Sequence, residues 1–268
     1  MNSLIIAYYK NLPALELIFN ALCVQSNTNF EVIVAEDAQD NETVDFISKW
    51  QAKKMFIIKH VSQADQGFRK TKILNAAVKV SSQDYLIFLD GDCIPHRHFI
   101  EAHTKAQAKG YALFGRRVML GKNKTDELLS ERKLALPNFI ELKLAKAKKT
   151  KYSFYLPFIK QERDVGIWGC NWSISKNELL AIDGFDENYV HAGIGEDVDI
   201  EWRLKQNGIK LLSIRFGAIV YHLHHKENYD ELAVKKGYAI LSAKKKNKKF
   251  NDEERTEHFT KEFKDKKS

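Results

Sequence analysis

Two aspartates separated by one glycine follow an almost wholly apolar run of the sequence. Asp90 and Asp92 come directly after Tyr85–Leu89, and Gly91 between them lets a bulky group approach the main chain. Residues i and i+2 of an extended chain point to the same side, so both carboxylates can face one ligand. Hard oxygen ligands suit Mg²⁺ or Mn²⁺, which commonly bridge carboxylates to substrate phosphates. A polar loop that only closes a strand is the alternative.

A second acidic group lies in Gly193–Leu204, where two glycines precede Glu196, Asp197 and Asp199. A carboxylate on such a glycine-flanked turn can act as a base toward a bound hydroxyl group. The following helix also favours acids at its N-terminus, and simple capping accounts for one of the three. From the residues alone, both interpretations stay open.

Histidines close the short apolar run that starts at Ile219. His222, His224 and His225 follow one another closely, and an imidazole at this place can join the two aspartates as a metal ligand. The three rings cannot easily all face one ion from a single strand, which argues against a three-histidine zinc site. A structural or solvated histidine is the other alternative.

A glycine-led turn, Gly67–Asn75, enters a helix and carries three cations. Arg69, Lys70 and Lys72 lie at or near the helix start, and this combination favours a bound diphosphate. A solvated basic helix face explains the same residues equally well.

These segments need a scaffold that brings distant strand ends together. Over the first ninety residues, short apolar runs alternate with stretches whose apolar side chains recur at helical spacing. The apolar runs are Ser3–Tyr9, Phe30–Ala35, Met55–Lys59 and Tyr85–Leu89, and the helical stretches are Ala14–Val24, Asn41–Lys54 and Lys70–Val80. This alternation predicts a doubly wound α/β fold with a mostly parallel sheet covered on both faces, whose ligands lie outside the carboxyl ends of the strands.

The pattern changes after residue 109. We expect one strand over Gly110–Met119, basic helices over Asn123–Lys151, and an aromatic-rich mobile segment over Tyr152–Arg163. The further elements expected are an apolar run at Trp168–Ser175, helices at Lys176–Ile182 and Val198–Asn207, strands at Lys210–Ile214 and Ala218–Tyr221, and a charged helical tail after Lys226. No internal repeat is present, which favours one domain with a tail.

Composition excludes several classes of protein. The 268 residues, 44% of them hydrophobic, predict a globular chain with a substantial core. No apolar run approaches the roughly 18 residues that a membrane span needs, and Met1–Lys10 lacks the basic start of a secretory signal. The widely separated Cys23, Cys93 and Cys170 indicate neither a disulfide framework nor a zinc ribbon, and they fit a reducing compartment. We therefore expect a cytoplasmic protein.

Taken together, the segments resemble the family 2 glycosyltransferases of the GT-A fold. The second half is similar to the catalytic region of the β-1,4-galactosyltransferases and of bacterial chondroitin-polymerase-type enzymes. The resemblance covers residues 3–226 and rests on Phe68–Asn75, Phe88–Pro95, Trp168–Ile200 and His222. It implies an inverting hexosyltransferase that moves a hexose or N-acetylhexosamine from a UDP-sugar to a glycan or lipid-linked glycan, in bacterial surface polysaccharide or glycolipid synthesis.

The resemblance also implies roles for individual residues. Asp92, Asp90 and His222 would hold Mn²⁺ (or Mg²⁺) on the donor diphosphate. Asp197 would be the general base, and Glu196 beside it would contact the sugar or the acceptor. The implied donor-binding residues are Tyr8, Asp37 near the uracil, Arg69 near the phosphates, Asp90, and the pair Trp168 and Gly169 on a segment that closes over the donor.

The same resemblance divides the chain into a GT-A domain (1–226) and a basic helical tail (227–268). Within the domain it implies a nucleotide-sugar-binding half (1–115), a basic helical insertion (116–165) and an added acceptor-side catalytic half (166–226). This sequence departs from the family's pattern at two places, which limits the residue roles that the resemblance implies. Glu36–Gln39 stands where the family has Asp-Asp-Gly-Ser, so the acid that meets the base is not fixed. Ile194 replaces the galactosyltransferase Trp, so the sugar preference does not carry over.

The formal charge of +8 points to an anionic partner. Most of the surplus lies in residues 116–151 and in Lys244–Lys249. One interpretation is a solvated helix face. The other is peripheral attachment to an anionic membrane on its inner face, to which each Lys contributes about 1 kcal/mol.

Three other functions compete with the transferase. A nucleic-acid binder would show a recognition helix or stacking aromatics, which we do not find, so we expect no nucleic-acid partner. A nucleotidyltransferase would need a glycine-rich basic loop where Lys10–Pro13 stands. A non-catalytic module that binds nucleotide sugars or glycans with the same fold is the main alternative, and the joint presence of Asp92, Asp197 and His222 argues against it.

Overall fold

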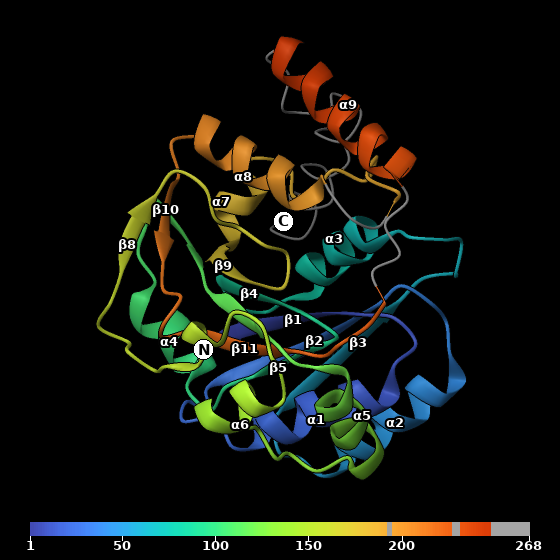
Figure 1. Ribbon diagram of the computed structural model, residues 1–268. Coiled ribbons are helices and arrows are strands. Elements are labelled where there is room, and N and C mark those ends of the chain that lie inside the picture. Colours follow the sequence, from blue (N-terminus) through green and yellow to red (C-terminus); the bar gives the residue numbers. More distant parts are fainter. Residues whose placement is uncertain (192–194, 227–230, 248–268) are drawn as a thin grey trace.

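The apolar runs of the first ninety residues form one half of an eight-stranded sheet. The computed structural model describes residues 1–191, 195–226 and 231–247. In it β1 (Asn2–Tyr8) pairs in parallel with β2 (Phe30–Glu36) and with β4 (Tyr85–Asp90), and β2 pairs in parallel with β3 (Ile57–Ser62). The strand order is β3-β2-β1-β4-β9-β6-β10-β8, and Figure 1 shows β1 to β4 side by side at the centre.

The other half of this sheet contains both strand directions. β9 (Asn171–Ser175) is antiparallel to β4 and to β6 (Tyr111–Phe114). β10 (Lys210–Ser213) is parallel to β6 and antiparallel to β8 (Gln161–Arg163). A second sheet of three strands has the order β5-β11-β7, made of Cys93–Pro95, Ile219–His222 and Arg116–Met119.

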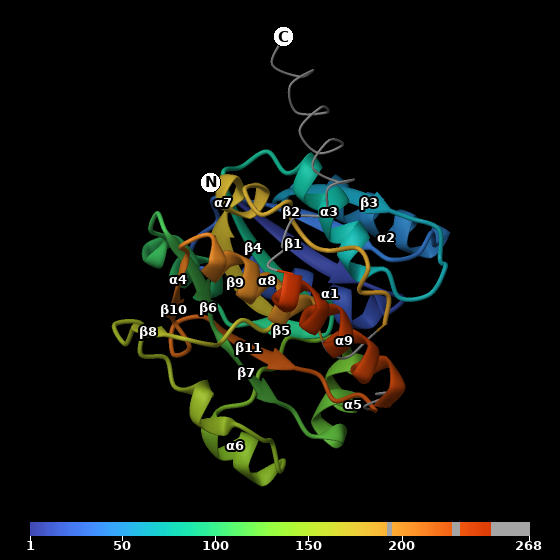
Figure 2. The same ribbon diagram turned by 90° about the horizontal axis from the view of Figure 1, so that it is seen from above.

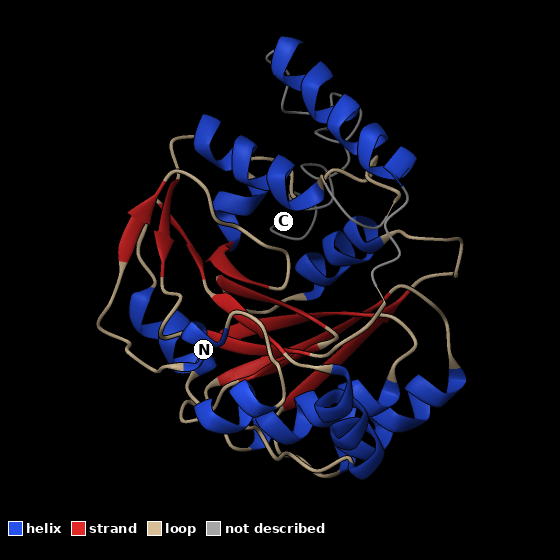
Figure 3. Cartoon of the chain, viewed as in Figure 1, coloured by secondary structure: helices blue, strands red, loops and turns tan. Residues whose placement is uncertain are grey.

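Helices cover both faces of the large sheet (Figure 3). One face carries α1 (Leu12–Cys23), α2 (Asn41–Ala52) and α4 (Phe99–Ala106). The opposite face carries α3 (Lys70–Val80), α7 (Lys176–Leu180) and α8 (Glu196–Gln206). Side chains of β1 alternate between the two layers: Leu4 and Ile6 pack toward α1, and Ile5 packs toward α3. The predicted doubly wound α/β fold is therefore confirmed.

A third core lies between α1 and the small sheet. It joins apolar side chains of α1, the small sheet, α5 (Lys122–Glu131) and α6 (Phe139–Leu144). A short 3₁₀ helix, η1 (Thr150–Ser153), follows α6. This core packs α1 against the small sheet, and so it holds the small sheet near the edge where the parallel strands end.

The expected strand over Gly110–Met119 is wrong. β6 ends at Phe114 and β7 begins at Arg116, and the two strands belong to different sheets. The break falls at Gly115, where a side chain would have its Cβ 2.3 Å from the Ala218 carbonyl oxygen. The expected mobile segment also differs from the structure, because residues 161–163 form β8 and pair with β10 at the sheet edge.

The charged tail is helical, as predicted, over α9 (Glu231–Asn247), but one of its lysines is an interior counter-ion. Lys244 forms ion pairs with Asp186 and Asp199, and Asp199 also pairs with Arg203 at 2.7 Å. Asp199 and Arg203 are buried, so the network holds α9 against α8, next to which it lies in Figure 2. Lys248, Lys249 and the rest of the predicted tail lie outside the described residues. No helix of the described ranges is long and apolar enough to cross a bilayer.

Candidate active site and metal site

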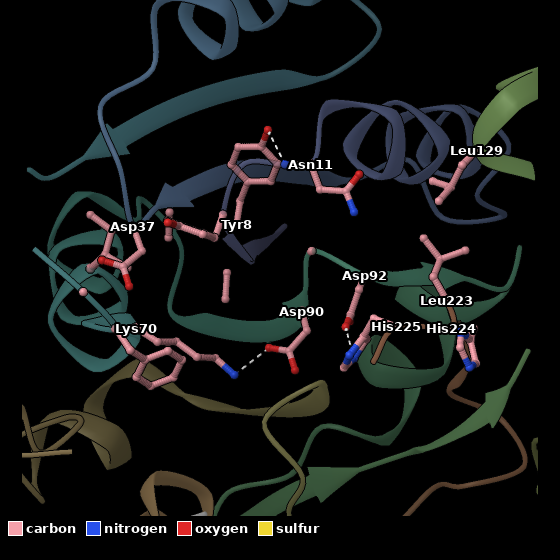
Figure 4. Close-up of a pocket in the computed structure, with 17 residues that line it drawn as sticks. Tyr8, Asn11, Asp37, Lys70, Asp90, Asp92, Leu129, Leu223, His224 and His225 are labelled. Carbon is pink, nitrogen blue, oxygen red and sulfur yellow. Dashed lines mark hydrogen bonds and ion pairs between the residues drawn. The ribbon is translucent and has the colours of Figure 1, made fainter. Parts of the chain in front are cut away.

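Two adjoining cavities open where the parallel strands end. The first, of about 640 Å³, is lined by residues that include Tyr8, Asp37 and Phe68. The second, of about 970 Å³, is lined by residues that include Trp168 and Asp197. The two cavities share the side chains of Phe68, Lys70, Asp90, Asp92, Leu223, His224 and His225. Figure 4 shows Asp37, Lys70, Asp90 and Asp92 along the first cavity.

Asp37 is the acid of the second strand that faces the first cavity. Its carboxylate accepts hydrogen bonds from Gln63 Nε2 at 2.6 Å and from the Arg69 N–H at 2.7 Å. The preceding Glu36 is fully buried and bonds instead to His60 at 2.8 Å. Of these two neighbouring acids, Asp37 is therefore the one that lines the first cavity. Tyr8 closes the same wall, where its hydroxyl accepts a hydrogen bond from the Asn11 N–H at 3.0 Å.

Lys70 is the cation at the junction of the cavities. Its Nζ lies 2.7 Å from Asp90 Oδ1 and 3.6 Å from Glu196 Oε1. Burial alone lowers the pKa of the ammonium group, but the charges of Asp90 and Glu196 outweigh it and hold the pKa well above its usual range. Lys70 therefore stays charged. Arg69 contributes its main chain at Asp37, and its side chain is not among those that line either cavity.

The pairing of two short strands brings Asp92 to His222. β5 and β11 are antiparallel with Cys93 opposite His222, and the Leu223 N–H donates to the Asp92 carbonyl at 2.9 Å. His222 Nε2 consequently lies 3.2 Å from Asp92 Oδ2. Two ligands at right angles on an octahedral ion, each about 2.1 Å from it, stand about 3 Å apart. The observed separation therefore fits two neighbouring ligands of one dication.

Other groups around this pair also fit a metal site. Ligand atoms of Asp92, Cys93 and His222 all lie within 4.8 Å of one another. The His222 Nδ1 atom is buried without a hydrogen-bond partner among the described residues. Burial acts to raise the pKa of Asp92, but hydrogen bonds from His222 and His225 prevail and hold it well below its usual range, so the group is a carboxylate. Mn²⁺ and Mg²⁺ prefer these oxygen and nitrogen ligands to the softer sulfur of Cys93.

The sequence interpretation missed His225. Its Nε2 lies 3.3 Å from the same Asp92 oxygen, and Figure 4 shows the ring directed at that carboxylate. In a continuous strand, His222 and His225 would point to opposite faces of the sheet. β11 ends at His222, so this alternation does not apply to His225, and the position of the strand end is what the sequence does not reveal. His224 lines both cavities, and its main-chain N–H donates to Thr125 Oγ1 at 2.8 Å.

The two acids predicted on a glycine-flanked turn belong to the first turn of α8. Gly195 precedes them with φ of 137°, a conformation that favours glycine, and a Cβ there would lie 2.4 Å from the Tyr189 ring. Gly193 and Ile194 lie outside the described residues. Burial and then the charge of Glu196 raise the pKa of Asp197 to about 6, against the opposing charge of Lys70. Asp197 is therefore a half-buried carboxylate that titrates near neutrality.

Trp168 and Gly169 form another wall of the second cavity, together with Glu196 and Asp197. The Trp168 ring is surrounded by cations, with Arg116 at 4.5 Å and Lys149 at 4.3 Å from its centroid. Lys146 and Lys148 also line this cavity, which the sequence did not predict. A two-residue bridge between Met119 and Lys148 brings that basic segment to the site.

Other residues of the matching motifs hold the scaffold together. The side chain of Asn75 donates to the Phe185 carbonyl at 2.8 Å and accepts from the Phe185 N–H at 2.9 Å. Buried Asn171 donates to the carbonyls of Arg116 and Ala218, which joins the two sheets. Asn75 holds the chain at Phe185, and Asn171 holds β7; neither residue lines either of the two cavities.

Solved structures share this fold at low sequence identity. GalNAc-T7 with UDP, GalNAc and Mn²⁺ aligns over 86% of this chain and 45% of its own, with a TM-score of 0.63 and 13% identity. TarS from S. aureus aligns over 91% of this chain and 39% of its own, with a TM-score of 0.60 and 16% identity. The mannosyltransferase PcManGT from Pyrobaculum calidifontis, with GDP-Man and Mn²⁺, covers 85% of this chain and 58% of its own, with a TM-score of 0.57 and 14% identity. The predicted GT-A architecture is confirmed.

Sequence comparison identifies the family. Chondroitin synthase of Pasteurella multocida (strain Pm70) is 25% identical over 91% of this chain. The chain spans only 27% of that relative's length. The profile described as "Glycosyl transferase family 2" matches residues 3–176, which is more than half of the chain. The protein is therefore a member of glycosyl transferase family 2.

Proposed function

We propose that this protein is a metal-dependent, inverting glycosyltransferase that moves a hexose or N-acetylhexosamine from a UDP-sugar to a glycan hydroxyl. The observation that carries the proposal is the joining of two cavities through Lys70, Asp90 and Asp92, with the acid pair Glu196 and Asp197 beyond the junction. A structural neighbour, TarS 1–349, is described in complex with UDP-GlcNAc. The bacterial chondroitin synthase relative supports a place in surface polysaccharide or glycolipid synthesis.

The first cavity suits the nucleoside of the donor. The Asp37 carboxylate is held by Gln63 and the Arg69 main chain, and it can accept a hydrogen bond from an N–H of the uracil ring. Tyr8 supplies an aromatic wall. At the junction, the Lys70 ammonium can neutralise a phosphate oxygen of the diphosphate.

The donor set at the junction suits Mn²⁺ or Mg²⁺. Asp92 and His222 would hold the ion, and His225 beside Asp92 could contribute. Asp90 lines the same cavity and is paired with Lys70. When bound, the ion supplies neutralisation of the negative charge that develops on the departing UDP. Lys70 adds a fixed positive charge at the same place, so the leaving group is stabilised by this chain's own residue as well.

Asp197 has the properties of the base. Its raised pKa makes it a stronger proton acceptor than an ordinary aspartate, while it stays ionised at neutral pH. It can take the proton of the acceptor hydroxyl as that oxygen attacks the anomeric carbon. Glu196, held near Lys70, can contact the sugar or the acceptor. One base opposite one leaving group gives a single displacement and therefore inversion.

The proposed division of the domain matches the residues that line the two cavities. Residues 1–115 carry the nucleoside side and residues 166–226 carry the acid pair, with the insertion 116–165 lending Lys146 and Lys148. A non-catalytic module of this fold would need neither a base of raised pKa nor its neighbouring cation. We propose the same division, followed by the tail 227–268, for the whole chain.

We further propose that the protein works in the cytoplasm, at the inner face of an anionic membrane. Ile140 and Leu144 are 69% and 79% exposed and lie four residues apart on α6, so they share one face of the helix. Phe158 is 77% exposed on a neighbouring loop, which the Phe139–Phe154 ring contact of 4.7 Å brings alongside α6. The basic residues around this exposed apolar group complement acidic headgroups. Such a position suits a lipid-linked acceptor.

Replacement of Asp92 tests the metal site. We expect Asp92→Asn to weaken Mn²⁺ binding in the presence of UDP by at least about tenfold, because the variant loses a charged ligand. Paramagnetic resonance of free Mn²⁺ measures this directly. The matched control is Asp126→Asn on exposed α5, which should bind Mn²⁺ as the unaltered protein does. Unchanged affinity in Asp92→Asn would contradict the assignment.

Replacement of Asp197 separates chemistry from donor binding. In assays with a panel of UDP-sugars and Mn²⁺, the unaltered protein should release UDP slowly from its true donor even without an acceptor. Asp197→Asn should reduce transfer to an acceptor by at least about a hundredfold, since general base catalysis is worth that much. Calorimetry should show nearly unchanged affinity for the donor. A variant that loses donor affinity would show that Asp197 is not primarily the base.

The pH dependence follows from the raised pKa of Asp197. Below about 6 the group is protonated and cannot accept a proton, so kcat/KM should rise with pH and level off above about 6. The neighbouring charges are Glu196, Lys70 and Asp90. Glu196→Gln removes the negative neighbour and should move the midpoint to lower pH. A rate that does not change across this range would refute the prediction.

Vesicle binding tests the membrane contact. At low salt, the protein should partition more strongly onto anionic than onto neutral vesicles, and sedimentation with the vesicles measures this. The double variant Ile140→Ser/Leu144→Ser should partition less. Val44→Ser/Met55→Ser removes two other exposed apolar side chains and serves as the control. Equal partitioning onto both kinds of vesicle would exclude the proposed attachment.

A further inference from the structure

A third cavity also has Trp168 in its lining, and apart from Trp168 it is lined by no residue proposed for the donor, the metal or the base. Its volume is about 460 Å³. We call it the basic pocket, because its described lining holds five cations and no carboxylate: Arg116, Lys149, Lys151, Arg163 and Arg215, with Phe114, Tyr152, Val165, Trp168 and Ser213. Four separate parts of the chain supply the cations, so the pocket is a product of tertiary folding rather than of one lysine-rich stretch.

The cation at its base is held in place. Arg116 Nη1 donates to the carbonyls of Gly115 at 2.9 Å and Gly166 at 2.6 Å. Its guanidinium lies 4.7 Å from the Phe114 ring centroid and 4.5 Å from that of Trp168. Burial, and then the charges of Arg215 and Arg163, lower the pKa of Arg116. Arg116 is therefore fixed, and it experiences the positive potential of its neighbours.

Four of the five cations of the basic pocket lack a described acidic partner. Among the residues that the structure describes, Arg116, Lys151, Arg163 and Arg215 form no ion pair with a carboxylate, and Arg163 bonds only to the Gln161 amide oxygen at 2.7 Å. Like charges gathered in this way repel one another, and the repulsion is relieved when an anion binds among them.

Trp168 connects the basic pocket to the chemistry. The ring lines both the basic pocket and the cavity that contains Glu196 and Asp197. A glycan that presents its hydroxyl to Asp197 can therefore extend past Trp168 into the basic pocket. The unit that enters must carry charge opposite to the arginines.

We propose that the basic pocket binds an acidic group of the acceptor, a carboxylate or a phosphate, beyond the sugar that receives the transfer. The inference rests on the proposed transferase function and names its acceptor class: an anionic glycan. Neutral glycans lack the group that the arginines recognise. The charge of the pocket thus selects acceptors, while the donor is selected in the first cavity.

Three probes of similar length distinguish the sources of the acidic group. They are an oligosaccharide with alternating hexuronic acid, an oligomeric polyol phosphate, and a neutral N-acetylhexosamine oligosaccharide. Calorimetry with the full chain, UDP and Mn²⁺ should show at least one acidic probe binding about tenfold more tightly than the neutral one, as expected for a charge-assisted contact. The tighter acidic probe identifies carboxylate or phosphate as the source.

Arg163→Gln/Arg215→Gln should weaken the acidic probe by about tenfold or more and flatten its salt dependence. Lys151→Gln provides a second variant that alters a single exposed side chain. Lys49→Gln/Lys109→Gln removes two exposed cations elsewhere and should bind as the unaltered protein does. Equal binding of acidic and neutral probes, no binding of any probe, or full affinity in both pocket variants would overturn the proposal.

Two further measurements distinguish this proposal from the proposed membrane contact and from the proposed transferase function. If the double arginine variant loses vesicle binding but keeps the acidic oligosaccharide, the pocket serves the membrane and the proposal fails. UDP release by the unaltered protein without any acceptor reports on the donor site alone. Its absence with every UDP-sugar would count against the transferase function, whereas its presence together with indifference to acceptor charge would count only against the basic pocket.

Discussion

The site depends on how the protein balances four carboxylates that lie around one junction. Lys70 stands between Asp90 of β4 and Glu196 of α8, and two imidazoles stand against Asp92. This distribution of positive charge is uneven. Asp92 is held as a carboxylate at low pH, while Asp197 has a pKa of about 6. Two aspartates thereby acquire different acidities from their surroundings, which suits one to the proposed role of ligand and the other to that of base.

The scaffold achieves this balance with strands of very different length. The long parallel strands deliver Asp37 and Asp90 to one edge of the large sheet, as their carboxyl ends must coincide there. A three-residue strand, β5, then turns the chain so that it pairs with β11 and meets His222. The small sheet needs the third core beneath it because so short a strand contributes few hydrogen bonds. The apolar residues of α5 and α6 therefore support the candidate metal site by packing under the small sheet.

The prediction of the fold from sequence succeeded where a signal is local, because apolar runs identified the parallel strands. Asp90, Asp92, Glu196 and Asp197 stand beside glycines or strand ends in the sequence, and the structure brings all four to the second cavity. The prediction failed where tertiary contacts decide. Gly115 separates two strands because of a close approach to Ala218, which no local pattern reveals. Lys70 lines both cavities and Arg69 lines neither, a difference that the basic turn does not reveal in the sequence. His225 was named within the histidine run, but only the structure shows that it reaches Asp92.

Ion pairs as well as packing hold the helix α9 against the rest of the protein. Asp186, Asp199, Arg203 and Lys244 together carry no net charge, and Lys244 comes from α9. If α9 moved away, Lys244 would leave with it, and the other three side chains would carry one net negative charge. Because Asp199 belongs to α8, the position of α9 bears on the charge balance of the helix that presents Glu196 and Asp197.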